Sequence, residues 1–73
     1  MTKTNLMSAA EYQSLRGIVM YAPGYNQESR FAALSQSEFY ARLQEFKRAA
    51  KRIGDDVSNI AAERYQDRML EKL

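Results

Sequence analysis

The side chains that most often carry chemistry in proteins are scarce in this sequence. It contains no His and no Cys, so the common general bases, thiol nucleophiles and zinc ligands are missing. It also lacks a glycine-rich phosphate-binding motif. Three acids spaced four residues apart form a row, namely Glu63, Asp67 and Glu71. Hard cations need more converging oxygens than one solvated helix face offers. The sequence therefore predicts a protein that is not an enzyme and that holds no metal or cofactor.

A basic cluster gives the first candidate surface. Its four side chains are expected on the side of a helix away from the apolar stripe of that helix; they are Lys47, Arg48, Lys51 and Arg52. The simpler interpretation is a solvated, salt-bridged surface. The alternative is that the cluster meets an acidic surface, either on a partner protein or along a nucleic-acid backbone.

A second candidate surface surrounds the sequence Pro23-Gly24. Tyr21 and Tyr25 have no place on an apolar stripe, and Met20 lies beside them. Five Tyr are many for this length, and Tyr is enriched where protein interfaces are buried. Each Tyr taken alone is expected to be a partly exposed turn residue, but the cluster favours partner binding. The predicted partner-binding residues are Met20, Tyr21, Tyr25, Lys47, Arg48, Lys51 and Arg52.

The most regular pattern predicts a central helix over residues 36–53. Ser35 and Glu38 have the spacing of a capping box, in which each side chain accepts a backbone N–H of the other residue. Apolar residues then follow at intervals of four and three, which places them on one stripe of a helix; they are Phe39, Leu43, Phe46, Ala50 and Ile53.

The capping-box spacing recurs at Ser8 and Glu11 and predicts a first helix over residues 9–21. Its expected apolar face consists of Tyr12, Leu15, Ile18, Val19 and Ala22. Pro23 and Gly24 then favour a type II turn with positive φ at the glycine. Asn26 suits the cap of a short helical turn over residues 30–34, with an extended segment as the alternative.

Gly54 divides the second half of the chain. Basic residues before it and Asp55 and Asp56 after it indicate the end of one helix and the start of another. One continuous helix would place Arg64 and Asp67 in an apolar seam, which is unfavourable. We therefore predict a third helix over residues 56–72, with the apolar stripe Val57, Ala61, Tyr65, Met69 and Leu73.

Two DNA-binding templates resemble this order of elements. In a helix-turn-helix, Gly54 takes the turn position, with Ala50 four residues before it and Ile60 six after it, although Asp55 and Glu63 stand where apolar residues are usual. In a ribbon-helix-helix, residues 30–34 would be the strand, followed by two helices joined at a glycine. Both resemblances imply a DNA-binding regulator, and the form of it that we expect uses the helices on either side of Gly54.

Length and composition limit the overall class. The 73 residues make a single domain over residues 1–73, in which residues 1–7 are expected to fray. The predicted fold is all-α, a small bundle of three main helices. So short a chain has a small core and no disulfide, so self-association as a homodimer is expected. No apolar run approaches a membrane span or a secretory signal, which predicts a soluble cytoplasmic protein.

These features together favour a binding protein. With 11 basic and 9 acidic side chains, the net charge is +2, which is too small to drive strong phosphate binding by itself. In size and class the chain is similar to the small inhibitors and modulators that phages and mobile elements encode. We therefore expect a non-enzymatic modulator or inhibitor that occupies a surface of another protein. The alternative is a DNA-binding transcriptional regulator.

Overall fold

The computed structural model describes residues 7–21 and 24–71. Its elements in chain order are α1 (Ala9–Tyr21), the short 3-10 helix η2 (Tyr25–Gln27), α2 (Gln36–Ile53) and α3 (Asp56–Glu71). The predicted all-α fold with three main helices is confirmed, and the described residues contain no strand. The predicted last residue of the third helix, Lys72, lies outside the described residues.

Both ends of α2 form as the sequence predicts. Glu38 N–H donates to Ser35 Oγ at 3.2 Å, and Ser35 N–H donates to Glu38 Oε1 at 2.7 Å, which completes the capping box. At the other end Gly54 has φ 78° and ψ 21°, and its N–H donates to the carbonyls of Ala50 and Lys51. A glycine adopts this left-handed conformation without steric cost, so the helix ends there.

The start of α1 uses only half of its predicted capping box. Glu11 N–H donates to Ser8 Oγ at 3.1 Å. The Glu11 carboxylate instead accepts two hydrogen bonds from the Arg42 guanidinium, at 2.6 and 2.8 Å. Residues 1–6 lie outside the described residues, but Met7, which we expected to fray with them, packs against the core.

The segment between α1 and α2 differs from the prediction. Gly24 has φ −68°, so the predicted type II turn, which requires positive φ at this glycine, is wrong; Ala22 and Pro23 lie outside the described residues. Asn26 lies inside η2 and does not cap it. Beyond η2, Phe31 N–H donates to the Glu28 carbonyl and Leu34 N–H to the Phe31 carbonyl. Residues 30–34 are therefore turns and not extended, and the strand of a ribbon-helix-helix is absent from this segment.

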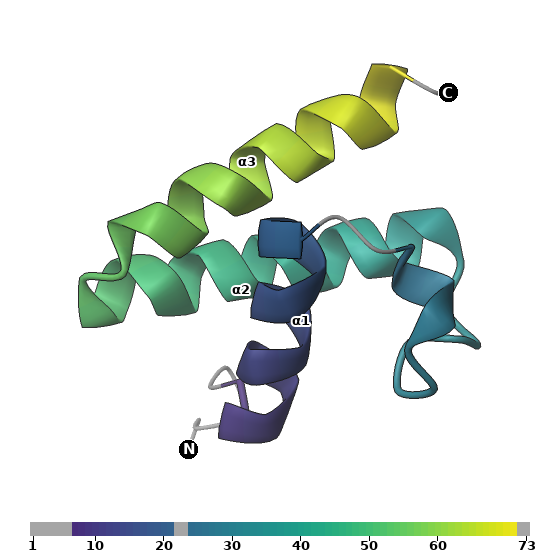
Figure 1. The fold of residues 1–73 in the computed structure, drawn as a ribbon, viewed down its shortest axis with the longest axis horizontal. Coiled ribbons are helices and arrows are strands. Elements are labelled where there is room, and N and C mark those ends of the chain that lie inside the picture. Colours follow the sequence, from purple (N-terminus) through teal and green to yellow (C-terminus); the bar gives the residue numbers. More distant parts are fainter. Residues whose placement is uncertain (1–6, 22–23, 72–73) are drawn as a thin grey trace.

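The three helices pack as a hairpin with a third helix across it. Figure 1 shows α2 and α3 as two arms that meet at the Gly54 turn and diverge from it, with α1 crossing them. α3 packs mainly on α2, and α1 contacts α3 more than it contacts α2. A helix-turn-helix crosses its two helices at about 90–120°, whereas α3 here folds back along α2.

An aromatic cluster on α2 lies at the centre of the core. The Phe39 ring stacks on Tyr25 at a centroid distance of 4.3 Å and meets the edges of Phe31 and Tyr65 at 5.6 and 6.1 Å. Further along α2, the Phe46 ring contacts the Tyr12 ring at a centroid distance of 4.7 Å. The buried apolar residues are Leu15, Ile18, Val19, Phe31, Phe39, Leu43, Phe46, Ala50, Ala62 and Met69.

The predicted α2 stripe is confirmed except at its end. Ile53 is 66% exposed, because the chain turns away at Gly54 before a neighbouring helix can cover the last turn.

The predicted apolar face of α3 is confirmed at Met69 and packs against the core at Ala61 and Tyr65, but it is wrong at Val57. Val57 is 61% exposed, whereas Ser58 and Gln66 are buried on the face that meets α1 and α2. Burial of these polar groups is tolerated because each has a hydrogen-bond partner. Ser58 Oγ donates to Asp55 Oδ2, and Gln66 Nε2 donates to the Tyr40 carbonyl at 3.4 Å. Of the remaining predicted positions, Met69 is buried, Ala61 and Tyr65 are half-buried, and Leu73 lies outside the described residues.

Two positions of the predicted α2 stripe provide a matched test. We expect Phe39→Ala to lower the free energy of unfolding by about 3–5 kcal/mol, because it removes a fully buried ring. We expect Ile53→Ala to change it by less than about 0.5 kcal/mol, because that side chain is mostly in solvent. Urea unfolding followed by circular dichroism measures both, and equal losses would contradict the core described here.

Candidate binding groove

An open groove lies between the end of α1 and the outer edge of α3. It has a volume of about 390 Å³ and is lined by Val19 and Met20 from α1 and by Val57, Ile60, Arg64 and Arg68 from α3. We call it the α1/α3 groove. It combines an apolar floor with two cationic side chains, as binding sites for amphipathic segments do.

Apolar side chains are left in solvent along this groove. Val57 is 61% and Ile60 52% exposed, and Tyr21, which follows Met20 at the end of α1, is 78% exposed. Single exposed apolar residues are normal, but a contiguous apolar area rimmed by polar groups is typical of interaction sites. Val57 and Ile60 lie on the same side of α3, because residues three apart share a helix face.

The position of α1, and therefore the groove, depends on the Asp55 carboxylate. Tyr12 OH from α1 and Ser58 Oγ from α3 both donate to Asp55 Oδ2, at 2.8 and 2.7 Å. Ser58 N–H donates to Asp55 Oδ1 at 3.2 Å, which caps the first turn of α3. Arg16 completes the junction: its Nε donates to Ser58 Oγ at 3.2 Å and lies 3.8 Å from Asp55 Oδ2.

These contacts shift the ionisation of the junction. The hydrogen bonds from Ser58 and then from Tyr12 lower the pKa of Asp55, because they stabilise the carboxylate. Burial, followed by the hydrogen bond to Asp55, raises the pKa of Tyr12. The junction is therefore an ionised carboxylate that holds a neutral phenol at neutral pH.

A second polar contact fixes the first turn of α1, at Glu11 beside Tyr12. The bidentate pair between Arg42 of α2 and Glu11 of α1 is half-buried, with oxygen-to-nitrogen distances of 2.6 and 2.8 Å. Its hydrogen bonds raise the pKa of Arg42. Bidentate pairs of this kind restrict orientation as well as distance, so the first half of α1 is held by polar contacts to both α2 and α3.

The predicted aromatic surface does not form as one exposed patch. Met20 is half-buried in the α1/α3 groove, and Tyr21 is exposed. Tyr25, in contrast, stacks on Phe39 and packs against the core. Its turn position suggested an exposed ring, but the sequence contains no sign of a partner fourteen residues away in α2.

The predicted basic cluster divides between two faces. Lys47, Arg48 and Lys51 line one shallow pocket of about 220 Å³ together with the amides Gln44 and Asn59. Arg48 also pairs with Glu45 at 2.6 Å. Arg52 instead lines a different groove beside Ile53 and Tyr12, because it lies further around the helix.

Comparisons with known proteins give no assignment. No protein-family model matches this chain, and neither curated proteins nor solved structures contain a match to it. The candidate site therefore rests on its own geometry. Within residues 7–21 and 24–71, no group of three or more acidic side chains is placed to hold a metal ion. No helix in the same ranges is long and apolar enough to cross a membrane.

Of the residues that line the groove, the sequence predicted Met20 as a binding residue and missed the exposed ones, which are Val57, Ile60, Arg64 and Arg68. Val57 was placed in the core because it continued an apolar rhythm with Ala61 and Tyr65. The available signal in the sequence was the polar pair Ser58 and Gln66. Both side chains are buried, and their burial turns Val57 and Ile60 outward. That burial depends on Asp55 and on the Tyr40 carbonyl, which are partners that periodicity does not reveal.

The Asp55 junction predicts a specific dependence of stability on pH. The ordinary pKa of Asp is about 3.9, and the folded protein lowers it. The junction therefore stabilises the fold fully above about pH 4 and loses that contribution as pH falls toward the folded pKa. We expect Asp55→Asn to lower Tm at pH 7 and to flatten the fall of Tm below pH 4.

Thermal unfolding between pH 2 and pH 7 measures this effect. Asp56→Asn is the matched control, because the neighbouring Asp56 side chain is exposed, and its pH profile should follow that of the unmodified chain. A profile for Asp55→Asn that parallels the control at every pH would contradict the junction.

Proposed function

We propose that this chain is a small, non-enzymatic protein-binding modulator or inhibitor that acts by occupying a surface of another protein. The observation that supports it most is the α1/α3 groove, where Val57 and Ile60 are left in solvent beside Met20 and two arginines. Exposed apolar side chains on a polar-rimmed groove favour association, because covering them releases water from apolar surface.

The geometry supports a protein partner over a small molecule. The groove is open to solvent along its length and has no buried polar group that would orient a compact ligand. An interface needs a central apolar contact with a charged rim, which Ile60 and the arginines supply.

We further propose a homodimer as the working form. A second groove of about 380 Å³ lies between the start of α2 and the end of α3, lined by Tyr40, Met69 and the half-exposed Leu70. Pairing through this face would leave the α1/α3 groove accessible to another protein. The proposed setting is the cytoplasm of a cell hosting a phage or mobile element, and a sequence without Cys fits a reducing compartment.

Photocrosslinking tests the proposed surface. With p-benzoylphenylalanine at Ile60, we expect one discrete adduct with another protein in the cells that make this chain. The same probe at Ala41, an exposed residue of α2, should give no such adduct. Adding Val57→Glu should reduce the Ile60 adduct by about tenfold, since a charge on the floor removes a central apolar contact.

Mass spectrometry of the adducts separates the outcomes. A single foreign protein at Ile60 supports the proposal. Equal labelling at Ile60 and Ala41, or an adduct that withstands Val57→Glu, would contradict it.

A DNA-binding regulator is the second candidate function. The supporting observation is the shallow pocket in which Lys47, Arg48 and Lys51 lie together with two amide side chains. The outward face of α3 opposes this function, because its exposed charges are four acids (Asp56, Glu63, Asp67, Glu71) and two arginines (Arg64, Arg68), and acids repel phosphates.

A salt-titrated gel-shift assay with random duplex DNA tests this candidate. If the pocket binds phosphates, the logarithm of the binding constant should fall with the logarithm of the salt concentration. The expected slope is about −2.7 for three phosphate contacts. The triple change of Lys47, Arg48 and Lys51 to Ala should abolish the shift, and the control Arg64→Ala with Arg68→Ala should preserve it. No shift at low salt would exclude duplex binding.

A further inference from the structure

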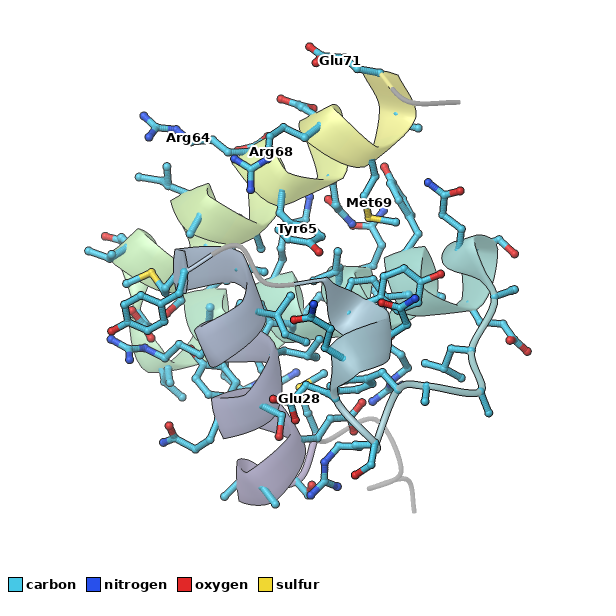
Figure 2. All side chains as sticks on the ribbon, turned by 45° about the vertical axis from the view of Figure 1, so that its right-hand side comes forward. Glu28, Arg64, Tyr65, Arg68, Met69 and Glu71 are labelled. Atoms are coloured by element: carbon cyan, nitrogen blue, oxygen red, sulfur yellow. The ribbon has the colours of Figure 1, made fainter. Side chains whose placement is uncertain are left out.

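Two arginines of the α1/α3 groove have no acidic partner among residues 7–21 and 24–71. Arg16, Arg42 and Arg48 each pair with a carboxylate. Arg64 and Arg68 form no ion pair with any residue that the structure describes, and the Arg68 guanidinium instead lies over the Tyr65 ring at 5.3 Å from its centroid. In Figure 2 both side chains extend from the same side of α3.

The spacing of the two arginines specifies what they can bind. Arg64 and Arg68 are one helical turn apart, which is about 6 Å along the helix axis. A partner helix with acidic side chains at positions i and i+4 presents two carboxylates at the same separation. Arginine binds carboxylates through two parallel hydrogen bonds, so each could take one acid.

The apolar floor of the groove adds a second requirement for the molecule that binds there. Met20, Val57 and Ile60 lie next to the arginines in the same groove, so an occupant must carry apolar and acidic side chains on neighbouring faces. An amphipathic helix does this, with apolar anchors at intervals of three and four. Addition of an extended peptide strand needs a free sheet edge, which the described residues do not offer.

We infer that the α1/α3 groove binds an acidic amphipathic helix of the partner protein, with its apolar side chains on Met20, Val57 and Ile60 and two carboxylates on Arg64 and Arg68. This inference rests on the proposed function and adds the chemistry of the partner. A second copy of this chain also carries acids at this spacing, at Glu63, Asp67 and Glu71 of α3, and the mass of the crosslinked adduct distinguishes that occupant below.

A peptide titration of the full-length, ¹⁵N-labelled chain tests the inference. The probe is a synthetic helical peptide with Leu on one face and Glu pairs spaced four apart beside it; its twin has Lys at every Glu. We expect the acidic peptide to bind about tenfold more tightly than the twin, to shift the amides of Met20 and Ile60, and to weaken as salt rises.

Charge reversal provides the sharper result. Arg64→Glu with Arg68→Glu should reverse the preference, so that the Lys twin binds more tightly than the acidic peptide. Both side chains are exposed, and amide resonances as dispersed as those of the unmodified chain show that the variant is folded. The control Lys47→Glu with Lys51→Glu should keep the original preference. Equal binding of the two peptides, absence of binding, or shifts confined to another face would overturn the inference.

The two experiments fail independently. A foreign adduct at Ile60 together with no peptide preference keeps the proposed function and overturns the acidic-helix assignment. If the adduct at Ile60 has twice the chain mass of 8.4 kDa, the occupant is a second copy, and the inference is likewise overturned.

Discussion

The arrangement of the three helices depends on one carboxylate, that of Asp55. It follows the left-handed Gly54, caps the first turn of α3 and accepts the phenol of Tyr12 from α1. A single side chain thus connects the α2–α3 turn to the helix that crosses it. Because hydrogen bonds to charged groups contribute more than neutral ones, this junction directs where α1 lies. The aromatic packing around Phe39 then fills the centre of the core.

The same junction determines which face of α3 becomes a surface. Ser58 is buried because it bonds both Asp55 and Arg16, and Gln66 is buried two turns later against the Tyr40 carbonyl. With these polar residues inside, Val57 and Ile60 must face outward on a helix of 3.6 residues per turn. The exposed apolar floor of the α1/α3 groove is therefore a consequence of polar burial, and it is the surface that we propose for another protein.

Local chemistry made the helices predictable, and long-range contacts made the candidate site less so. The boundaries of α2 follow from Ser35, Glu38 and Gly54, whose roles need only neighbouring residues. The groove, in contrast, brings Met20 next to Ile60, forty positions away. Tyr25 was similarly misplaced, because its stacking on Phe39 requires the fold to exist first. Of the predicted binding residues, Met20 lines the groove, Tyr21 is the exposed residue after it, and the basic cluster lies elsewhere.

The central claim is that α1 docks against α3 so that Val19 and Met20 face Ile60 and Ala61 across one groove. Methyl-to-methyl nuclear Overhauser effects in the ¹³C-labelled chain test it most directly. The account predicts cross-peaks between the methyl groups of these two helices, and predicts that Asp55→Asn weakens them. Sharp, dispersed methyl spectra in which α1 and α3 share no cross-peak would contradict the docking of α1 and, with it, the groove.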